Sequence, residues 1–340
     1  MTTNPFKAIG FAMAVAGKEK SFRANPVLGS PRLNKMGLHR SRVTIAAKLS
    51  DLRRKGMARG LSREDRENFD ENGYFLKTDY LSPEDFAALK ADVFEQAIAA
   101  REMRQGQTVT RMASLSALPG TLGRSIAARR DLNAMLNYAS GRRGAPVIGL
   151  QTVIADQKNK RADPQTQMHA DTFHPTAKMW LFLTDVGEED GPFVFVPGSH
   201  KLTPERLNWE YEQSLTAQSD ERLHHALGSF RITPDMLPSL GYGSPRRMAV
   251  KANTLIVADT FGFHHRASSD KPTTRVELYG YLRRNPFIPW NGLDLSGLPG
   301  VRGRQLDWFF RYLSMREKHL SKTGIWKDVG KVQMQAKARI

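Results

Sequence analysis

Residues 167–186 read QMHADTFHPTAKMWLFLTDV, a cluster of polar side chains that runs directly into an apolar segment. His169 and Asp171 are separated by one residue, and in an extended chain this spacing points both side chains to the same side. A neutral imidazole beside a carboxylate suits Fe(II), Mn(II) or Zn(II). The pair therefore indicates a metal site at the start of a strand, although an ordinary turn that leads into a strand can use the same residue types.

The apolar segment is one of a series. β-Branched and aromatic residues bounded by Gly, Pro, Asp and Asn predict strands at 146–156, 176–186, 192–197, 253–263 and 274–283. Strands and helices do not alternate here, which argues against a Rossmann fold or a TIM barrel. We expect a mainly β fold with flanking helices, in which an antiparallel barrel or jelly roll forms the core.

The flanking helices have recognisable starts. Ser62 precedes an acidic first turn, and Ser82 precedes Pro83 and a second acidic turn, so each serine is expected to cap a helix. Further helices are expected at 129–142 and at 203–227. We expect a basic arm at 1–60, a β domain at 61–290 with an insertion or lid at 203–245, and a basic helical extension at 291–340.

Charge is concentrated at the two ends of the chain. Residues 1–60 carry 13 basic and 2 acidic side chains and residues 301–340 carry 10 and 3, which leaves the middle almost neutral within a total of +17. Basic ends favour anionic partners, including a membrane surface, but they also aid solubility. Residues 42–57 can form a basic amphipathic helix, with Val43, Ile45, Ala46, Leu49 and Leu52 on one side. This helix is expected either to pack on its own domain or to lie on a membrane.

The composition restricts the kind of metal site. The chain has no cysteine, so a metal must be held by His, Asp or Glu. No apolar run approaches the twenty residues that a transmembrane helix needs. We expect a cytoplasmic protein, with possible contact at the inner membrane surface through the arm.

A third ligand is available in residues 253–287, NTLIVADTFGFHHRASSDKPTTRVELYGYLRRNPF. His264 and His265 end one predicted strand and Arg275 begins the next. If SSDKP forms a hairpin turn, Arg275 lies across from one of the two histidines, where its guanidinium can hold a carboxylate in bidentate fashion. The alternative is that Arg275 pairs with Glu277 or Asp270. Two His and one carboxylate with open coordination positions are typical of non-haem Fe(II) oxygenases.

These features together resemble the phytanoyl-CoA dioxygenase family of Fe(II)/2-oxoglutarate oxygenases. The resemblance extends from about residue 65 to 290 and includes FDENGYFLKTDYLSPEDFAAL, MHAD, GPFVFVPGSHK and the His…Arg segment. It implies a double-stranded β-helix braced by helices from the N-terminal half. It also implies Fe(II), 2-oxoglutarate and O2 as cofactor and cosubstrates.

The resemblance assigns roles to individual residues. It implies His169, Asp171 and a late histidine as metal ligands, and GFHHR resembles a GFHxRG pattern in which the first histidine, here His264, binds iron. It further implies Arg275 as the 2-oxoglutarate anchor. A looser mapping places Gln151, Lys178 and Trp180 around the cosubstrate, and His174, His265 and Arg266 toward the substrate. For His174, capping of the turn at Pro175 is the alternative.

The implied reaction is hydroxylation of a small-molecule or lipid-type substrate, with release of succinate and CO2. An anionic or membrane-bound substrate is one option, which the basic ends of the chain favour. Asp171 favours hydroxylation over halogenation, because related halogenases have a small residue at that position. Three alternatives remain at this stage: a non-catalytic β-helix binding protein, a nucleic-acid oxidative demethylase, and a cupin that uses another metal. Nucleic acid is not the expected partner, because no cluster of aromatic stacking residues accompanies the basic arm.

Overall fold

Two antiparallel sheets form a double-stranded β-helix in the computed structural model, which describes residues 5–155, 161–269, 271–291, 294–298, 300–320 and 324–340. The order of the large sheet is β1 (Tyr74–Lys77), β8 (Leu255–Asp259), β5 (Ala177–Phe182), β10 (Thr273–Leu282), β4 (Val147–Ala155), β3 (Thr108–Ser114), β2 (Ile98–Gln105) and β11 (Lys327–Val332). The small sheet consists of β7 (Arg246–Met248), β6 (Phe193–Phe195) and β9 (His264–Arg266). The expected fold class is confirmed.

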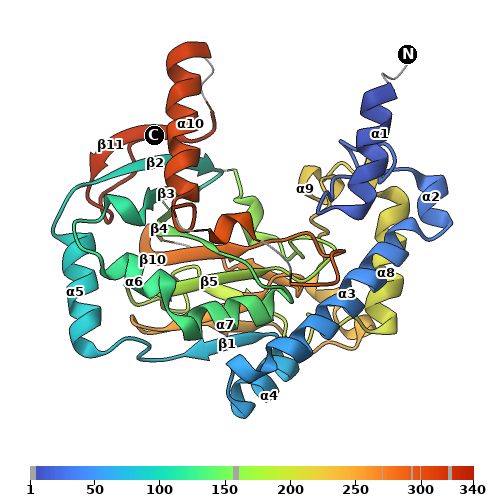
Figure 1. The fold of residues 1–340 in the computed structure, drawn as a ribbon, viewed down its shortest axis with the longest axis horizontal. Coiled ribbons are helices and arrows are strands. Elements are labelled where there is room, and N and C mark those ends of the chain that lie inside the picture. Colours follow the sequence, from blue (N-terminus) through green and yellow to red (C-terminus); the bar gives the residue numbers. More distant parts are fainter. Residues whose placement is uncertain (1–4, 156–160, 270, 292–293, 299, 321–323) are drawn as a thin grey trace.

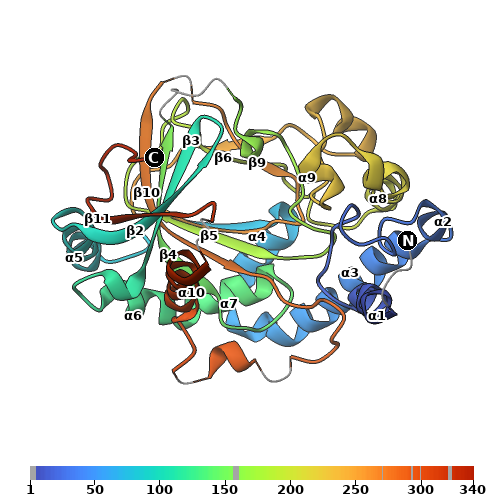
Figure 2. The same ribbon diagram turned by 90° about the horizontal axis from the view of Figure 1, so that it is seen from above.

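Helices surround this core (Figures 1 and 2). The chain forms α1 (Pro5–Met13), α2 (Pro31–Lys35), α3 (Leu38–Met57), α4 (Arg63–Asn72), α5 (Pro83–Phe94), α6 (Leu122–Ala128), α7 (Arg130–Ala139), α8 (Pro204–Thr216), α9 (Leu223–Ala226) and α10 (Gln305–Leu320). Ser62 accepts a hydrogen bond from the Asp65 amide at 3.0 Å, and Ser82 accepts one from the Asp85 amide at 3.1 Å. Both predicted helix caps are therefore present.

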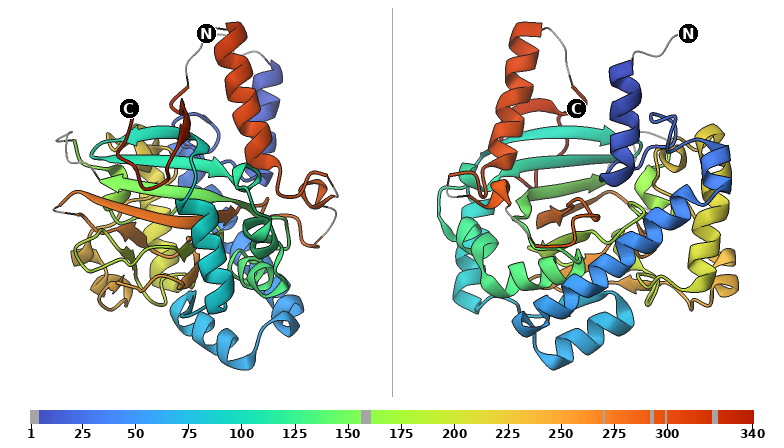
Figure 3. Two further views of the ribbon diagram at one scale, coloured as in Figure 1. Left: turned by 90° about the vertical axis from the view of Figure 1, so that its left-hand side faces the viewer. Right: turned by 45° about the vertical axis from the view of Figure 1, so that its right-hand side comes forward.

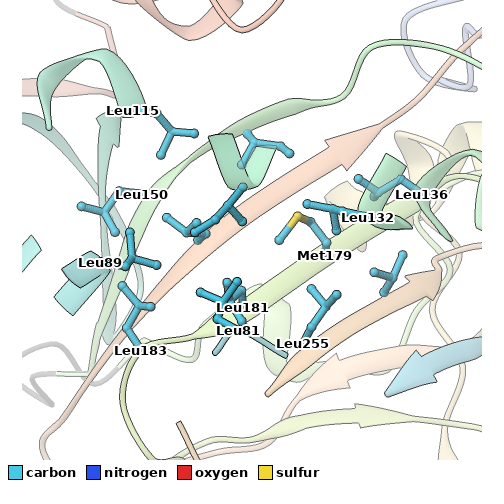
Figure 4. Close-up of a cluster of buried hydrophobic side chains, with 14 of the residues drawn as sticks. Leu81, Leu89, Leu115, Leu132, Leu136, Leu150, Met179, Leu181, Leu183 and Leu255 are labelled. Atoms are coloured by element: carbon cyan, nitrogen blue, oxygen red, sulfur yellow. The ribbon is translucent and has the colours of Figure 1, made fainter. Parts of the chain in front are cut away.

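The two faces of the large sheet have different environments. Its outer face packs against α4–α7 through an aliphatic core that includes Leu89, Leu132, Leu150, Met179 and Leu181 (Figure 4). Its inner face meets the small sheet through aromatic side chains such as Trp180, Phe182, Phe193 and Phe195. Side chains alternate between the faces of a strand, so each strand that supplies the outer core also presents residues to the space between the sheets.

The predicted hairpin between residues 264 and 275 is wrong. β9, which contains His264, pairs with β6 in the small sheet, whereas β10, which contains Arg275, lies between β5 and β4 in the large sheet. Consecutive strands here cross from one sheet to the other. Arg275 and His264 therefore approach each other across the space between the sheets and not along one ladder.

Four strands, β2, β3, β7 and β11, lie where no strand was expected. β2 and β3 pair as a hairpin that follows α5, and β11 lies in the C-terminal segment that was expected to be helical. The sequences of β2, β3 and β11, which are IAAREMRQ, TVTRMAS and KDVGKV, are rich in residues that also suit helices or loops. Pairing at the edge of the large sheet determines their conformation, as tertiary context often overrides local preference.

The N-terminal helix α3 packs on its own domain, the first of the two alternatives. Val43 and Ala46 are buried, but Ile45 and Leu52 are 48% and 59% exposed and do not belong to the packed face. Arg42 donates to the carbonyls of Val15, Gly17 and Glu19. Much of the basic arm is therefore tied to the fold, while the division of the chain at residues 60 and 290 stays a prediction.

No helix among the described residues is both long and apolar enough to cross a membrane.

A buried ion pair fixes the C-terminal tail. Arg111 and Glu102 are both fully buried, and two guanidinium nitrogens lie 2.8 and 2.5 Å from the same carboxylate oxygen. Arg111 also donates to four backbone carbonyls between Gln333 and Lys337. The other carboxylate oxygen accepts the amides of Arg339 and Ile340. The tail thus supplies most of the hydrogen bonds that make this buried pair tolerable.

We expect Glu102→Ala to lower the free energy of unfolding by about 3–5 kcal/mol, because it leaves a buried guanidinium without its counter-charge. Glu67→Ala is the control, since its pair with Arg63 is exposed on both sides and such pairs contribute about 0.5 kcal/mol or less. Urea-induced unfolding measures both. Similar losses in the two variants would contradict this role of Glu102.

Candidate metal centre and cosubstrate pocket

Three potential ligands converge at one end of the space between the sheets. One ligand atom each from His169, Asp171 and His264 lies within 4.8 Å of the others. The Asp171 Oδ1 is 3.6 Å from the His169 Nε2 and 3.8 Å from the His264 Nε2. The structure thus brings together the three residues that the sequence predicts as ligands, and it is His264 rather than His265 that joins the cluster.

Backbone pairing holds the two histidines beside each other. The amide of His169 donates to the carbonyl of His264 and the amide of His264 donates to the carbonyl of His169, both at 2.9 Å. The amide of Asp171 donates to the carbonyl of Thr260 at 2.9 Å. The HxD segment is therefore fastened to the strand that carries the third ligand before any metal is considered.

The ring orientations fit a metal ion. The Nδ1 atoms of His169 and His264 face the carbonyls of Gln167 and Gly262 at 2.7 and 2.9 Å, which directs both Nε2 atoms toward Asp171. The buried Nε2 of His264 has no hydrogen-bond partner among the residues that the structure describes. Metal-binding histidines commonly have this arrangement, with the second ring nitrogen held by a carbonyl.

The charge states of the three residues also fit a metal ion. Burial lowers the pKa of both imidazoles, that of His264 well below its usual range. Burial alone raises the pKa of the Asp171 carboxyl, but the Lys178 ammonium and the neighbouring histidines outweigh this and hold that pKa well below its usual range. Neutral imidazoles and an ionised carboxylate are the forms that bind a divalent metal.

Two lysines hold Asp171 from outside the triad. The Lys178 Nζ lies 2.7 Å from the Asp171 Oδ2, which leaves Oδ1 facing the histidines. The Lys20 Nζ donates to the Asp171 backbone carbonyl at 2.5 Å, and burial lowers the pKa of Lys20 to about 8. The sequence indicates a cosubstrate contact for Lys178 and gives no signal for Lys20, because Lys20 and Asp171 lie 151 residues apart.

A cavity of about 420 Å³ opens beside the three ligands, a size within the usual range for small-molecule sites. Among its described lining residues there is no carboxylate, whereas Lys178, Arg266 and Arg275 all contribute to its wall. Much of the remaining wall is aromatic or apolar: Met103, Met112, Trp180, Phe193, Tyr279, Tyr281, Leu306, Phe309, Phe310 and Trp326. The three cations pair with Asp171, Asp163 and Glu277, so an anion that binds in the cavity has to share them with these carboxylates, and an apolar group fits the rest of the wall.

Arg275 lies in this wall but has a partner already. Its Nε is 2.7 Å from the Glu277 Oε2, although the two groups are not aligned for a hydrogen bond, and its Nη1 donates to the Gly191 carbonyl at 2.8 Å. Gln151 donates to the other Glu277 oxygen at 2.7 Å. The pairing with Glu277 that the sequence allows is thus present, and it coexists with a position from which Arg275 can reach a carboxylate in the cavity.

The other predicted contacts divide into two groups. Trp180, Gln151, His265 and Arg266 line the cavity, and Arg266 donates to the buried carboxylate of Asp163 at 2.9 Å. His174 does not line it: its ring is buried and its Nδ1 lies 2.9 Å from the Pro175 carbonyl. For His174 the structure therefore favours the turn-capping alternative.

A protein-family model matches the part of the chain that contains two of the three potential metal ligands. Residues 69–229 match the model of the phytanoyl-CoA dioxygenase (PhyH) family. Over this segment, which is just under half of the chain, the sequence is similar to that family. The match includes His169 and Asp171 and ends before His264 and Arg275, so the roles of those two residues rest on the geometry described above.

No curated protein is similar enough in sequence to match the chain. Among solved structures, the non-heme alpha ketoglutarate dependent carbocyclase SnoK from nogalamycin biosynthesis shares 18% identity at a TM-score of 0.43, over 80% of this chain and 98% of that one. The epimerase SnoN from the same biosynthesis shares 18% at 0.44, over 64% and 81%. HygX from Streptomyces hygroscopicus, solved with nickel, 2-oxoglutarate and hygromycin B, shares 15% at 0.37, over 65% and 87%.

We expect His264→Ala to weaken Mn(II) binding to the metal-free protein by more than about 100-fold, because even residues that only support a metal ligand contribute 10- to 100-fold. His265→Ala is the matched control and should bind Mn(II) as the unaltered protein does. Calorimetry, or the loss of the free Mn(II) resonance signal, measures both. Equal losses in the two variants, or a loss in His265→Ala alone, would show that the third ligand is misassigned.

We expect Arg275→Met to weaken 2-oxoglutarate binding to the metal-loaded protein by roughly 30-fold or more, the usual cost of removing one member of a buried charge pair. The double variant Arg275→Met/Glu277→Gln tests whether the loss comes merely from an unpaired Glu277, and it should bind 2-oxoglutarate as weakly as the single variant. Anaerobic titration under the visible Fe(II)–2-oxoglutarate band gives the affinity. Recovery of binding in the double variant would exclude Arg275 as the anchor.

Proposed function

We propose that this protein hydroxylates a small molecule that has a substantial apolar part, using Fe(II), 2-oxoglutarate and O2. In the balanced reaction a substrate C–H becomes C–OH, while 2-oxoglutarate and the second oxygen atom become succinate and CO2. The observation that carries the proposal is the convergence of His169, Asp171 and His264 beside a cavity whose described lining is cationic and aromatic. The PhyH match supports the same chemistry.

Each part of the site has a defined task in this proposal. Iron, when bound by the triad, supplies the activation of O2 that couples loss of CO2 from 2-oxoglutarate to oxidation of the substrate. His169, Asp171 and His264 would hold the ion and would leave coordination positions open to the cosubstrates. Lys178 holds the second oxygen of Asp171, which favours a single oxygen ligand from that carboxylate.

The remaining residues bind and orient. Arg275 is proposed to hold the distal carboxylate of 2-oxoglutarate, and Gln151 and Glu277 to fix the position of its guanidinium. Trp180 and Phe193, whose ring centroids are 4.4 Å apart, exclude water from the space beside the ligands. The carboxylate of Asp171 occupies the position that halogenation requires to be small, so hydroxylation is the outcome we propose.

The substrate class follows from the outer part of the cavity. Tyr281, Met103 and Met112 from the sheet and Phe309 and Phe310 from α10 all line the cavity. Such a wall binds an apolar body better than a sugar or a free amino acid. We therefore propose a lipid-like or polycyclic substrate, with any anionic group directed toward the cations nearer the metal.

A metabolite screen scored by succinate tests this proposal. We expect at least one apolar compound to raise Fe(II)- and O2-dependent succinate formation several-fold over the rate without substrate. In Asp171→Ala the substrate-stimulated rate should fall by at least about 100-fold. His174→Ala, outside the cavity, should keep it. Absence of the visible band with anaerobic Fe(II) and 2-oxoglutarate would instead indicate a non-catalytic binding protein, and substrate turnover without succinate would indicate a cupin with different chemistry.

A further inference from the structure

Helix α10 has two apolar stripes on opposite sides. Leu306, Phe310 and Leu313 have the spacing i, i+4, i+7 and form one stripe; Trp308, Tyr312 and Met315 have the same spacing and form the other. At about 100° per residue the centres of the stripes are roughly half a turn apart. An amphipathic helix on a protein surface normally has one such stripe, facing the core.

The inner stripe packs on the domain. Leu306, Phe309 and Phe310 line the metal cavity, and Leu313 is buried. Gly149 in β4 makes this contact possible, because a Cβ at that position would lie 2.6 Å from the Leu306 Cδ2. The orientation of α10 is fixed further by Arg101, whose guanidinium donates to both Glu317 oxygens at 3.0 Å and to the Ser314 hydroxyl at 2.7 Å.

The outer stripe faces solvent, because the inner stripe and the bonds from Arg101 fix the orientation of α10. Trp308, Tyr312 and Met315 are 46%, 50% and 54% exposed. In Figures 1 and 3 α10 projects from the body of the molecule, and α1 projects from the same side. α1 adds Ile9 and Met13, which are 58% and 72% exposed and also four residues apart. Two elements from opposite ends of the chain, both on this side of the molecule, thus carry exposed apolar side chains.

The charge around the outer stripe is positive. Arg304, Arg311 and Lys318 are exposed and lie along one border of the stripe by helical position. The two acidic residues of α10 are engaged elsewhere, since Asp307 accepts a hydrogen bond from Ser116 at 2.6 Å and Glu317 pairs with Arg101. An aromatic and apolar centre with a basic border is typical of helices that bind the interface of an anionic membrane.

We propose that the outer stripe of α10 docks on the surface of an anionic phospholipid bilayer, and that an amphiphilic substrate enters the cavity from that surface. The second clause rests on the proposed function, whereas the first does not. A bilayer fits the stripe better than a second copy of the chain, because the copy brings the same basic border and a net charge of +17 against it. Tryptophan and tyrosine are also favoured at the level of lipid headgroups.

Entry from the bilayer follows from the position of α10. One side of the helix carries the docking stripe and its other side forms part of the cavity wall, through Phe310 and the neighbouring Phe309. A molecule held at the bilayer surface next to the outer stripe is therefore one helix diameter, about 10 Å, from the cavity. An apolar tail can remain in the lipid while the reacting carbon reaches the metal ligands.

Co-sedimentation with vesicles tests the docking surface. The full-length protein is mixed with vesicles of phosphatidylcholine alone or with 30 mol% phosphatidylglycerol, and compared with the variant Trp308→Ser/Tyr312→Ser/Met315→Ser. None of these three residues lines the cavity. The control is Ile45→Ser/Leu52→Ser on α3, which removes exposed apolar side chains of similar exposure from the basic arm.

We expect the unaltered protein and the α3 control to bind the anionic vesicles equally, and the α10 variant to bind them at least about tenfold more weakly. Arg311→Glu/Lys318→Glu should remove the preference for anionic over neutral vesicles. Failure of the unaltered protein to bind, or equal binding by the α10 variant, overturns the proposal. A dimer in sedimentation velocity that the α10 variant abolishes, without vesicle binding, would assign the stripe to a second copy instead.

Two controls separate this outcome from folding and from catalysis. The α10 variant should show the same thermal unfolding midpoint as the unaltered protein, since its three substituted side chains are about half exposed. It should also keep the visible band with anaerobic Fe(II) and 2-oxoglutarate. If the unaltered protein binds vesicles but does not give the band, the docking surface stands and the proposed chemistry is rejected. If it gives the band but does not bind vesicles, the chemistry stands and the docking surface is rejected.

Discussion

The pair of backbone hydrogen bonds between His169 and His264 is the constraint on which the rest of the site depends. It joins an irregular segment before β5 to the first residue of β9, and it sets two imidazoles side by side with ring centroids 4.6 Å apart. Ser199 reinforces it by accepting the amide of Phe263, the residue before His264, at 2.8 Å. The two bonds between His169 and His264 involve only the backbone, so the fold sets the geometry of the site. The side chains therefore need little reorganisation to accept an ion.

The polar residues around this bridge form successive layers that depend on one another. Lys178 and Lys20 hold Asp171 from the strand and from the N-terminal segment. Arg275, Glu277 and Gln151 form a buried group farther along the same sheet. Buried charges are tolerated only when they are paired. Asp171 therefore requires Lys178, and Arg275 requires Glu277. A cosubstrate carboxylate that binds Arg275 has to share the guanidinium with Glu277.

Local features of the sequence predicted much of this arrangement. The spacing of His169 and Asp171, the caps at Ser62 and Ser82 and the β-branched runs are local signals, and local signals survive folding when tertiary contacts agree with them. Arg275 lines the same cavity as His169 and His264, but the hairpin offered as the cause of this placement was wrong, and its role as the 2-oxoglutarate anchor stays a prediction. A double-stranded β-helix sends consecutive strands to opposite sheets, and nothing in residues 264–275 shows this.

Contacts between distant segments account for what the sequence did not reveal. Lys20 reaches Asp171 because the N-terminal segment packs against the insertion at residues 203–245. There the amides of Phe22 and Arg23 donate to the carbonyl of Ala226. The C-terminal residues were expected to form a helical extension, yet they supply an edge strand, a cavity wall and an exposed apolar stripe. None of these three roles can be read from helical periodicity. Periodicity shows that an apolar stripe exists, but it does not show which of two stripes packs on the domain.

A crystal structure of the protein grown anaerobically with Mn(II) and 2-oxoglutarate tests the central claim most directly. The account predicts one metal ion at about 2.1 Å from the Nε2 atoms of His169 and His264 and from one oxygen of Asp171, with the distal carboxylate of 2-oxoglutarate on Arg275. A metal ion bound through His265 or His174, or 2-oxoglutarate bound away from Arg275 while the Arg275–Glu277 pair stays closed, would contradict it.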